Sequence, residues 1–378
     1  MSDALLIKDF LNPFSINYLL GDIRLNESQW GSHISYYGEE FPDLHNTDIV
    51  IMGIPDERGN GSSIIQGEAP DCIRKQFYQL YQWHPDIRIA DIGNIKAGKS
   101  LSDTYAAART VIKELTEQKI TVIILGGSHD LTLAQYGAYA ERKKIIEATC
   151  VDAHINLVSD SAIQSENFLM EMLTGEPNYI KHYNHLAFQS YFVHPSMLQT
   201  MDKLRFDCYR LGSVKEKIEE MEPVLRGSHM LSVDLSALAH AYAPGTAVSP
   251  NGLNGEEICT ITRYAGMSPL LNSIGIYGYN SDEDVQQLTA MQIAHMIWYF
   301  VDGRVKGKAE AKLTNRDDFN EFHTAFNEID TLFLQSKKTG RWWMQMPDGK
   351  IIPCSHNDYR IAAHNEIPER WFRVQERG

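Results

Sequence analysis

The sequence has little cysteine, and the few cysteines are far apart. Among 378 residues the five are Cys72, Cys150, Cys208, Cys259 and Cys354, with no close pair. An odd and dispersed set is typical of reduced, mostly buried thiols rather than of a disulfide framework. This pattern favours a cytoplasmic protein.

Long apolar runs and an excess of positive charge are also lacking. The longest apolar candidate, residues 120–125, is far below the roughly 20 residues that a membrane helix needs. Residues 1–10 hold no apolar leader, so no signal peptide is expected. The net charge of −14 comes without a basic stripe that could neutralise phosphates. We therefore expect no membrane and no nucleic-acid partner, and a small-molecule substrate instead.

Internal repeats are absent too, and what the sequence does contain is an alternation of two patterns. Apolar, β-branched runs typical of strands buried on both faces lie at residues 48–54, 87–92, 120–125, 145–151, 208–211, 230–235 and 273–277. Helical patterns lie between them at residues 69–81, 102–118, 131–144, 255–265 and 282–300. The alternation predicts an α/β fold, a three-layer αβα sandwich around a mostly parallel sheet.

Three regions differ in pattern along the chain. Weak periodicity over residues 1–45 predicts an N-terminal cap with at most a short helix. The α/β domain spans residues 46–302, and its polar, irregular stretch 159–195 is expected to contact ligand. Residues 303–378 hold short antiparallel strand patterns around a Pro-Asp-Gly turn, which predicts a C-terminal extension packed on the main domain.

Ligand-type side chains follow three of the predicted strands. Gly126 and Gly127 permit a tight turn after residues 120–125, from which His129 and Asp130 project. A single histidine in such a loop is more often structural than functional. The case for a site therefore depends on the other two strand ends.

Those two strand ends add carboxylates, an imidazole and neutral donors. After residues 145–151, Asp152, His154 and Asn156 alternate, so on an extended segment they share one face. Asp234 and Ser236 share a face by the same rule. The carboxyl ends of parallel strands meet at one edge of a sheet, where such folds bind ligands. Buried unpaired carboxylates are costly, so the group predicts a metal or catalytic site.

The three motifs resemble those of the arginase–agmatinase–formimidoylglutamase (ureohydrolase) family. Residues 126–129 are similar to its Gly-Gly-Asp-His motif, residues 152–156 to Asp-Ala-His-x-Asp, and residues 232–236 to Ser-x-Asp-x-Asp. The order and spacing hold across about residues 47–302. Residues 249–252, 263–268 and 341–343 further resemble a bacterial formimidoylglutamase-like subgroup.

The resemblance implies an arginase-like fold and hydrolysis of a linear C–N bond in an amidine, guanidine or amide. The implied substrate is formimidoylglutamate, attacked by metal-activated water. Active members of the family hold two Mn²⁺. Matched residue by residue, the ligands that remain here are His129, Asp152, His154 and Asp234.

Four departures from the family pattern bear on this site. Asn156 and Ser236 stand where the family has carboxylates, and a guanidinium-binding Glu falls near Gly278. A catalytic-loop His is replaced within residues 165–167. Two lost anionic ligands predict a weakened site that suits one divalent ion, Mn, Zn or Ni, better than two.

Further roles are assigned to residues near the same edge. His129 is expected to be a fourth ligand or a general base, with Asp130 as a second proton carrier. Arg58 and Asn60 are expected to contact a substrate carboxylate, because arginine offers a bidentate fork. Ser165 and Asn167 are expected to contact substrate as well.

Two other functions stay open, together with the oligomeric state. A metal-free pseudoenzyme, serving as a binding or assembly protein, would pair its four ligand-type residues by salt bridges and hydrogen bonds. A single-metal amidase of the deacetylase type would use Asp152, His154 and Asp234. The family is often oligomeric, so a homo-oligomer is expected. Arg341-Trp342-Trp343 is interpreted as packing rather than as a ligand-stacking surface.

Overall fold

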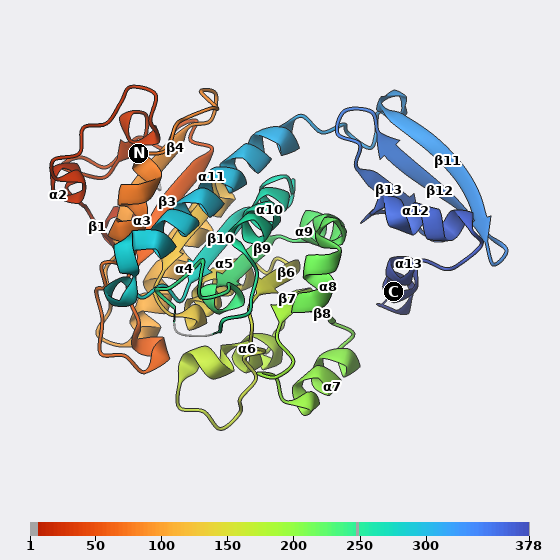
Figure 1. Ribbon diagram of the computed structural model, residues 1–378, viewed down its shortest axis with the longest axis horizontal. Helices are drawn as coiled ribbons and strands as arrows, with labels where there is room; N and C mark the ends of the chain where they lie inside the picture. Colours follow the sequence, from red (N-terminus) through yellow and green to blue (C-terminus); the bar gives the residue numbers. More distant parts are fainter. Residues whose placement is uncertain (1–6, 247–248, 378) are drawn as a thin grey trace.

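A ten-stranded sheet runs through the centre of the molecule (Figure 1) in this computed structural model, which describes residues 7–246 and 249–377. The strand order is β1-β4-β3-β5-β10-β9-β6-β7-β8, and β2 also pairs with β4. The β1–β4 pair is antiparallel and the other pairs are parallel, as predicted. The strands are β1 (Leu11–Asn12), β2 (Ser35–Tyr36), β3 (Ile49–Ile54), β4 (Ile89–Ile95), β5 (Thr121–Gly126), β6 (Ile146–Val151), β7 (Ile180–Phe188), β8 (Asp207–Arg210), β9 (Met230–Asp234) and β10 (Ser273–Tyr277).

Helices cover both faces of this sheet, because successive side chains of a strand point to opposite sides. In β5, Ile123 and Leu125 join the core with α3, α10 and α11, whereas Val122 and Ile124 join α4 and α5. This arrangement is the predicted three-layer sandwich. The helices are α2 (Ile16–Leu20), α3 (Ala69–Tyr78), α4 (Leu101–Glu117), α5 (Thr132–Glu141), α6 (Gln164–Thr174), α7 (Pro195–Lys203), α8 (Leu211–Glu216), α9 (Met221–Gly227), α10 (Gly255–Gly266) and α11 (Leu288–Lys308).

The N-terminal segment adds two short strands to this sheet. From residue 7 onward it contains β1, α2 and β2, and both strands pair with β4. Residues 1–6 lie outside the described residues, so the expectation of no signal peptide falls largely outside them too. Across residues 7–246 and 249–377, no helix is both long enough and apolar enough to cross a membrane.

The predicted irregular stretch 159–195 is wrong for much of its length, because it contains α6 and the nine-residue strand β7. The β7 sequence is rich in polar residues and does not look like a buried strand. In the sheet these polar groups are satisfied: His182 Nε2 lies 3.1 Å from Asp207 Oδ2, and His185 Nε2 lies 3.1 Å from the Asp152 carbonyl oxygen. Tertiary hydrogen bonds thus make a polar strand acceptable.

The C-terminal extension is a separate layer beside the main sheet (Figure 1). Helix α11 continues to Lys308, past the predicted boundary at residue 302. An antiparallel sheet then follows in the order β11-β12-β13-β14, which contains the predicted short strands and adds β11. Its elements are β11 (Phe319–Phe326), β12 (Ile329–Ser336), β13 (Trp342–Gln345), β14 (Ile351–Cys354), α12 (His356–Ala363) and α13 (Glu369–Arg377).

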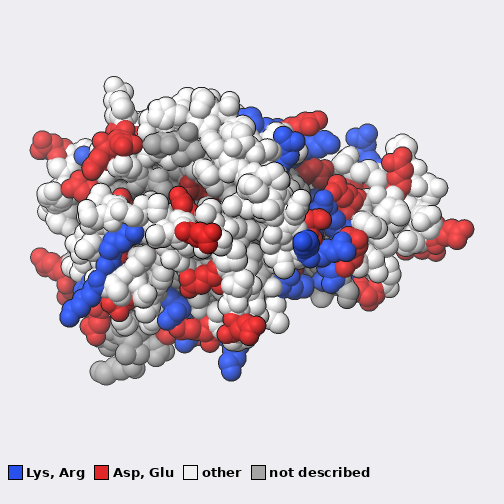
Figure 2. Space-filling view, turned by 90° about the horizontal axis from the view of Figure 1, so that it is seen from below, with Lys and Arg blue, Asp and Glu red and all other residues white. Residues whose placement is uncertain are grey.

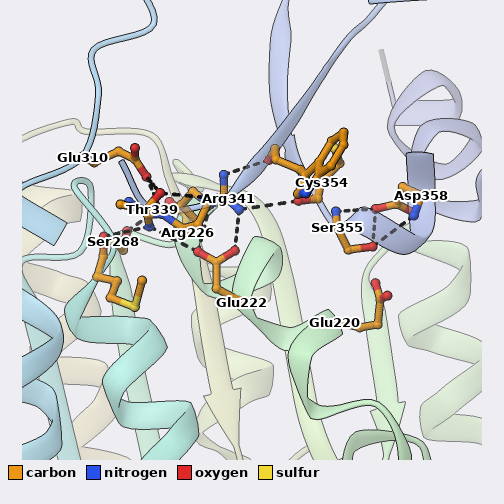
Figure 3. Close-up of polar contacts among 12 residues, drawn as sticks. Glu220, Glu222, Arg226, Ser268, Glu310, Thr339, Arg341, Cys354, Ser355 and Asp358 are labelled. Atoms are coloured by element: carbon orange, nitrogen blue, oxygen red, sulfur yellow. Dashed lines mark hydrogen bonds and ion pairs between the residues drawn. The ribbon is translucent and has the colours of Figure 1, made fainter. Parts of the chain in front are cut away.

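A buried charge network attaches this extension to α9 (Figure 3). Arg226 Nε donates to Glu222 Oε1 at 2.9 Å, and Arg226 Nη1 donates to the Trp342 carbonyl oxygen at 2.9 Å. The guanidinium also lies 4.3 Å from the ring centre of Trp343. Arg341 reaches the same carboxylate, with Nη1 3.2 Å from Glu222 Oε1. Residues 341–343 are therefore buried packing residues, as interpreted from the sequence.

Candidate metal centre

Two glycines bring the loop after β5 close to its neighbours. A Cβ on Gly127 would lie 2.1 Å from the Asp56 carbonyl oxygen, and one on Gly126 would lie 2.1 Å from the Tyr277 ring. Neither glycine has a positive φ. They are needed for close approach of the backbone to neighbouring elements rather than for the tight turn that the sequence suggests. The following 3₁₀ turn, His129–Leu131, then directs His129 inward.

His129, Asp152 and Asp234 converge at the carboxyl ends of β5, β6 and β9. His129 Nδ1 lies 3.0 Å from Asp152 Oδ2 and 3.4 Å from Asp234 Oδ2. His154 lies on the outer side, with Nδ1 3.6 Å from Asp152 Oδ1. The side chains of His129 and Asp152 are 2% exposed, whereas that of His154 is 40% exposed. Solvent therefore reaches the cluster from the His154 side.

The two neutral residues of the motifs both donate to one carboxylate. Asn156 Nδ2 donates to Asp152 Oδ2 at 2.7 Å, and Ser236 Oγ donates to Asp152 Oδ1 at 2.7 Å. Asn156 Nδ2 also lies 3.3 Å from His129 Nδ1. The structure thus brings together all six residues that the sequence motifs place at this edge.

The segments that carry these residues are turned rather than extended. The backbone N–H of His154 donates to Asp152 Oδ1 at 2.8 Å, and that of Ser236 donates to Asp234 Oδ1 at 2.7 Å. Such Asx-type turns form because a carboxylate can accept from the backbone two residues later. The residues meet through these turns, so the predicted alternation along an extended strand is wrong in detail.

The two carboxylates differ in how easily each gains a proton. Burial raises the pKa of Asp152, but hydrogen bonds from His129 and His154 outweigh it and hold the pKa well below its usual value. For Asp234, burial and the nearby charge of Asp152 raise the pKa. Burial lowers the pKa of His129, yet Cys150, Asp234 and Asp152 together hold it above its ordinary value. The cluster therefore concentrates negative charge beside one imidazole.

Two distances in this cluster have the length found between neighbouring ligands of one divalent ion. Two ligand atoms about 2.1 Å from a shared ion lie roughly 3.0–3.4 Å apart in octahedral or tetrahedral geometry. The distances from His129 Nδ1 to Asp152 and Asp234 fall in that range. Asp152 Oδ1, the oxygen that lies 3.6 Å from His154 Nδ1, already accepts a hydrogen bond from the Ser236 hydroxyl. The donor set suits a hard cation at the inner position.

The far side of the His129 ring is held by Ser232 and Thr132, to which the sequence assigned no role. Ser232 Oγ lies 2.9 Å from His129 Nε2 and 2.6 Å from Thr132 Oγ1. With Nε2 bonded to this pair, Nδ1 is the nitrogen that faces the carboxylates. The available signal was the position of Ser232 in the motif of residues 232–236. Ser232 lies two residues before Asp234 on β9, so both side chains point to the same face of the sheet.

Cys150 also contacts this ring, although the sequence suggests only a core thiol. Its Sγ lies 3.7 Å from His129 Nε2, and His129, Cys150 and Asp152 form a group close enough to hold a metal ion. However, the thiol meets Nε2 while the carboxylate meets Nδ1, and one imidazole cannot bind one ion through both nitrogens. Burial raises the pKa of the Cys150 thiol. The Cys150 thiol and the Asp152 carboxylate thus face opposite nitrogens of the His129 ring.

Two residues with predicted roles are engaged elsewhere. The Asp130 carboxylate accepts the Tyr105 hydroxyl, and its Oδ1 lies against Gly59. The Arg58 guanidinium pairs with Asp56 at 2.6 Å and donates to the carbonyl oxygen of Lys99 at 2.9 Å. Asp56 is fully buried and needs this counter-charge. In the structure Asp130 and Arg58 thus contact other groups of the protein, and their roles in proton transfer and substrate binding stay predictions.

The other predicted contact residues lie on the 3₁₀ turn Arg58–Asn60 and on helix α6. Asn60 is exposed at the end of a 3₁₀ turn, and Ser165 is half-buried on α6. Asn167 donates to the Ser161 carbonyl oxygen at 2.8 Å. The α6 residue that meets the cluster is Phe168, whose ring centre lies 4.7 Å from that of His129. The helix therefore closes one side of the site with an apolar ring.

Gly278 leaves space beside Asp234. It has φ +81°, and a Cβ there would lie 2.9 Å from Asp234 Oδ2. A larger side chain at this position would crowd the carboxylate and strain the backbone.

A wide groove lies at the opposite edge of the sheet, near the amino ends of β6, β7 and β8. It has a volume of about 1290 Å³ between the main domain and the extension, where Lys and Arg side chains also gather (Figure 2). Its lining includes Asp207, Arg370 and Arg373 but no residue of the cluster. Most charged groups of the groove already pair with one another. We therefore identify the candidate centre by the convergence of its donor atoms and not by the volume of a cavity.

Comparison with known proteins finds matches across the main domain. The model of the arginase family matches residues 47–302. A formimidoylglutamase of Streptococcus gordonii is 23% identical over 303 residues, which cover 73% of this chain and 91% of the relative. One of Staphylococcus haemolyticus is 24% identical over 273 residues, which cover 68% and 86%.

Solved structures share the fold. Formimidoylglutamase of Bacillus subtilis superposes with a TM-score of 0.67 at 18% identity, covering 75% of this chain and 95% of that one. Formiminoglutamase of Trypanosoma cruzi, crystallised with Mn²⁺, gives a TM-score of 0.62 at 18% identity, covering 70% and 99%. In both superpositions about a quarter or more of this chain lies outside the matched part.

Proposed function

The chain belongs to the arginase family, and from that premise we propose that it is a metal-dependent hydrolase that cleaves a linear C–N bond of an amidine. The substrate suggested by the names of its relatives is formimidoylglutamate, which water would convert into glutamate and formamide. The observation that carries the proposal is the convergence of His129 Nδ1 with the carboxylates of Asp152 and Asp234.

The chain's own residues bind and orient in this scheme. Asp152, Asp234 and His129 Nδ1 would hold one divalent ion, with Asn156 and His154 beside them. Such an ion activates water and polarises the carbon that is attacked. The Ser232–Thr132 pair holds the His129 ring, and Phe168 restricts water on one side. The open side at His154 admits the substrate.

Metal content tests the first half of this proposal. Protein purified without chelator and then incubated with Mn²⁺, Zn²⁺ or Ni²⁺ is expected to retain about one ion per chain by elemental analysis. Asp152→Ala should retain none, because it removes the carboxylate that His129, His154, Asn156 and Ser236 all contact. Asp330→Ala, an exposed carboxylate on β12, is the matched control. A wild-type chain that retains no ion would contradict the proposal.

Product analysis tests the second half. Release of formamide from formimidoylglutamate, dependent on the added ion and lost in Asp234→Ala, is the expected result. An ion that binds without any amidine turnover, but with cleavage of N-acetyl amides, would replace the amidine with an amide substrate.

A further inference from the structure

The antiparallel sheet of the C-terminal extension has two edges, and only one of them is covered. At the first edge β14 lies against α9, where Arg226 Nη2 donates to the Cys354 carbonyl oxygen at 3.5 Å. At the second edge lies the eight-residue strand β11, which among the described residues pairs with β12 alone. Figure 1 shows β11 on the side of the extension that faces away from the main domain. A long uncovered strand edge is a template for pairing with another chain.

The register of the β11–β12 hairpin shows which backbone groups of β11 face the free edge. The loop Asn327–Glu328 has positive φ at both residues, as in a type I′ turn, so its neighbours Phe326 and Ile329 form a hydrogen-bonded pair. Such pairs occur at every second residue of an antiparallel ladder. The N–H and C=O groups of Glu321 and His323 therefore point away from β12. In the described part of the chain these groups have no backbone partner.

The side chains of the same two residues are exposed and lie on one face of β11. Glu321 and His323 are two residues apart, so they point to the same side of the sheet. Across residues 7–246 and 249–377, neither side chain forms a hydrogen bond or an ion pair. On the other face the ring of Phe322 is half-buried, with its centre 5.1 Å from that of Trp342 and 5.2 Å from that of Tyr359. The edge thus presents a carboxylate, an imidazole and one side of an aromatic ring.

We propose that β11 pairs with β11 of a second copy of this chain, in an antiparallel register centred on Phe322, so that two extensions form one continuous sheet. A two-fold axis relates two identical strands that pair in this way. In this register Glu321 of each copy lies opposite His323 of the other, in a hydrogen-bonded pair on the same face. The two Phe322 rings meet at the axis, in the non-hydrogen-bonded position where opposing side chains are closest.

The neighbouring registers match the side chains less well. A pair centred on Glu321 would place two carboxylates directly opposite each other, and a pair centred on His323 would do the same with two imidazoles. Like charges in such positions are destabilising, whereas a carboxylate opposite an imidazole is stabilising. The register centred on Phe322 also uses residues 319–325 of both strands, which allows about eight main-chain hydrogen bonds. Backbone pairing supplies the affinity, and the side chains select the register.

The pairing strand lies outside the part of the chain that matches known relatives by family. The arginase family model ends at residue 302, and β11 begins at Phe319. The candidate metal centre lies in the main domain, at the carboxyl ends of β5, β6 and β9. The association is therefore independent of the proposed function, and substitutions in β11 should leave metal retention unchanged.

Sedimentation velocity of the full chain tests the association. The wild type is expected to reach at least twice the chain mass of 43.0 kDa as its concentration rises. Glu321→Lys places a cation opposite His323 of the second copy at both ends of the pair, and it should weaken association by about tenfold. His323→Pro removes an N–H that the single chain does not use, so the hairpin should fold and the pairing should be lost.

A charge swap and a matched control separate this register from general effects. The double variant Glu321→Lys with His323→Glu restores an opposite-charge pair and should restore association. Asp330→Lys makes the same change of charge on the neighbouring strand β12 and should leave the mass of the wild type. Circular dichroism should be the same for all variants. A wild type that keeps the mass of one chain, a mass that is unchanged in both Glu321→Lys and His323→Pro, or a charge swap that fails to restore association would overturn the proposal.

Discussion

Replacing Arg226 by methionine removes the central cation of the network that attaches the C-terminal extension (Figure 3). The Arg226 side chain is 3% exposed and forms a bidentate pair with Glu222. It also donates to the Trp342 carbonyl oxygen and lies over the ring of Trp343. Methionine keeps much of the side-chain volume, so the change mainly removes charge and hydrogen bonds.

The expected loss of stability in Arg226→Met depends on the Glu222 charge that remains buried. Removing one partner of a buried ion pair typically costs about 3–5 kcal/mol, because the other charge is left uncompensated. In the variant Glu222 still pairs with Arg341, whose Nη1 lies 3.2 Å from Glu222 Oε1. The expected cost of removing Arg226 is therefore at the lower end of that range. The Trp342 carbonyl oxygen also loses a donor. We expect the free energy of unfolding to fall by about 3 kcal/mol.

Urea unfolding followed by tryptophan fluorescence measures this change, since Trp342, Trp343 and Trp371 lie in the extension. Limited proteolysis should also cut the linker after α11 faster in the variant. Arg205→Met is the matched control, because the Arg205–Glu376 pair also joins the main domain to α13 but is exposed, at 58% and 33%. That variant should lose less than about 1 kcal/mol. Similar small losses in both variants would refute the assigned role of Arg226.

Three further predictions concern the site and the fold. Asn156→Asp places a third carboxylate near His129 Nδ1, beside Asp152 and Asp234, and should tighten Mn²⁺ binding by at least about tenfold in a competition titration. An unchanged affinity would contradict the placement of the ion. Burial raises the pKa of Asp207, but His182 and Arg377 outweigh this effect and lower the pKa below its ordinary value. The ionised Asp207 carboxylate therefore stabilises the fold above about pH 4, and this stabilisation is lost as the pH falls further. Asp207→Asn should therefore flatten the dependence of stability on pH between about 5 and 2, and a wild-type slope in the variant would exclude this origin. Gly127→Ala should destabilise by about 1–3 kcal/mol or more in urea, because its Cβ would meet the Asp56 carbonyl oxygen at 2.1 Å, and Gly212→Ala, with open space around its Cβ, is the control.

The sequence alone determined the sheet and the edge at which the site lies. Runs such as residues 120–125 and 230–235 are mostly apolar, which favours burial on both faces, and the polar motifs lie at or just after their ends. Strand β7 escaped prediction because its pattern is polar. Its side chains are acceptable in the interior only through partners on other strands, such as Asp207 for His182.

Tertiary structure decided which polar residues share a site. Asp130 and His129 are adjacent in sequence, yet one meets Tyr105 and the other meets Asp152 and Asp234. Arg58 looked suited to a ligand, but its partner Asp56 is two residues away and fully buried, so pairing within the fold takes precedence. Phe192 looked unremarkable in sequence and stacks on His154 in space. The type of side chain determines which groups a residue can bind, and packing in the folded protein determines which of those groups lies next to it.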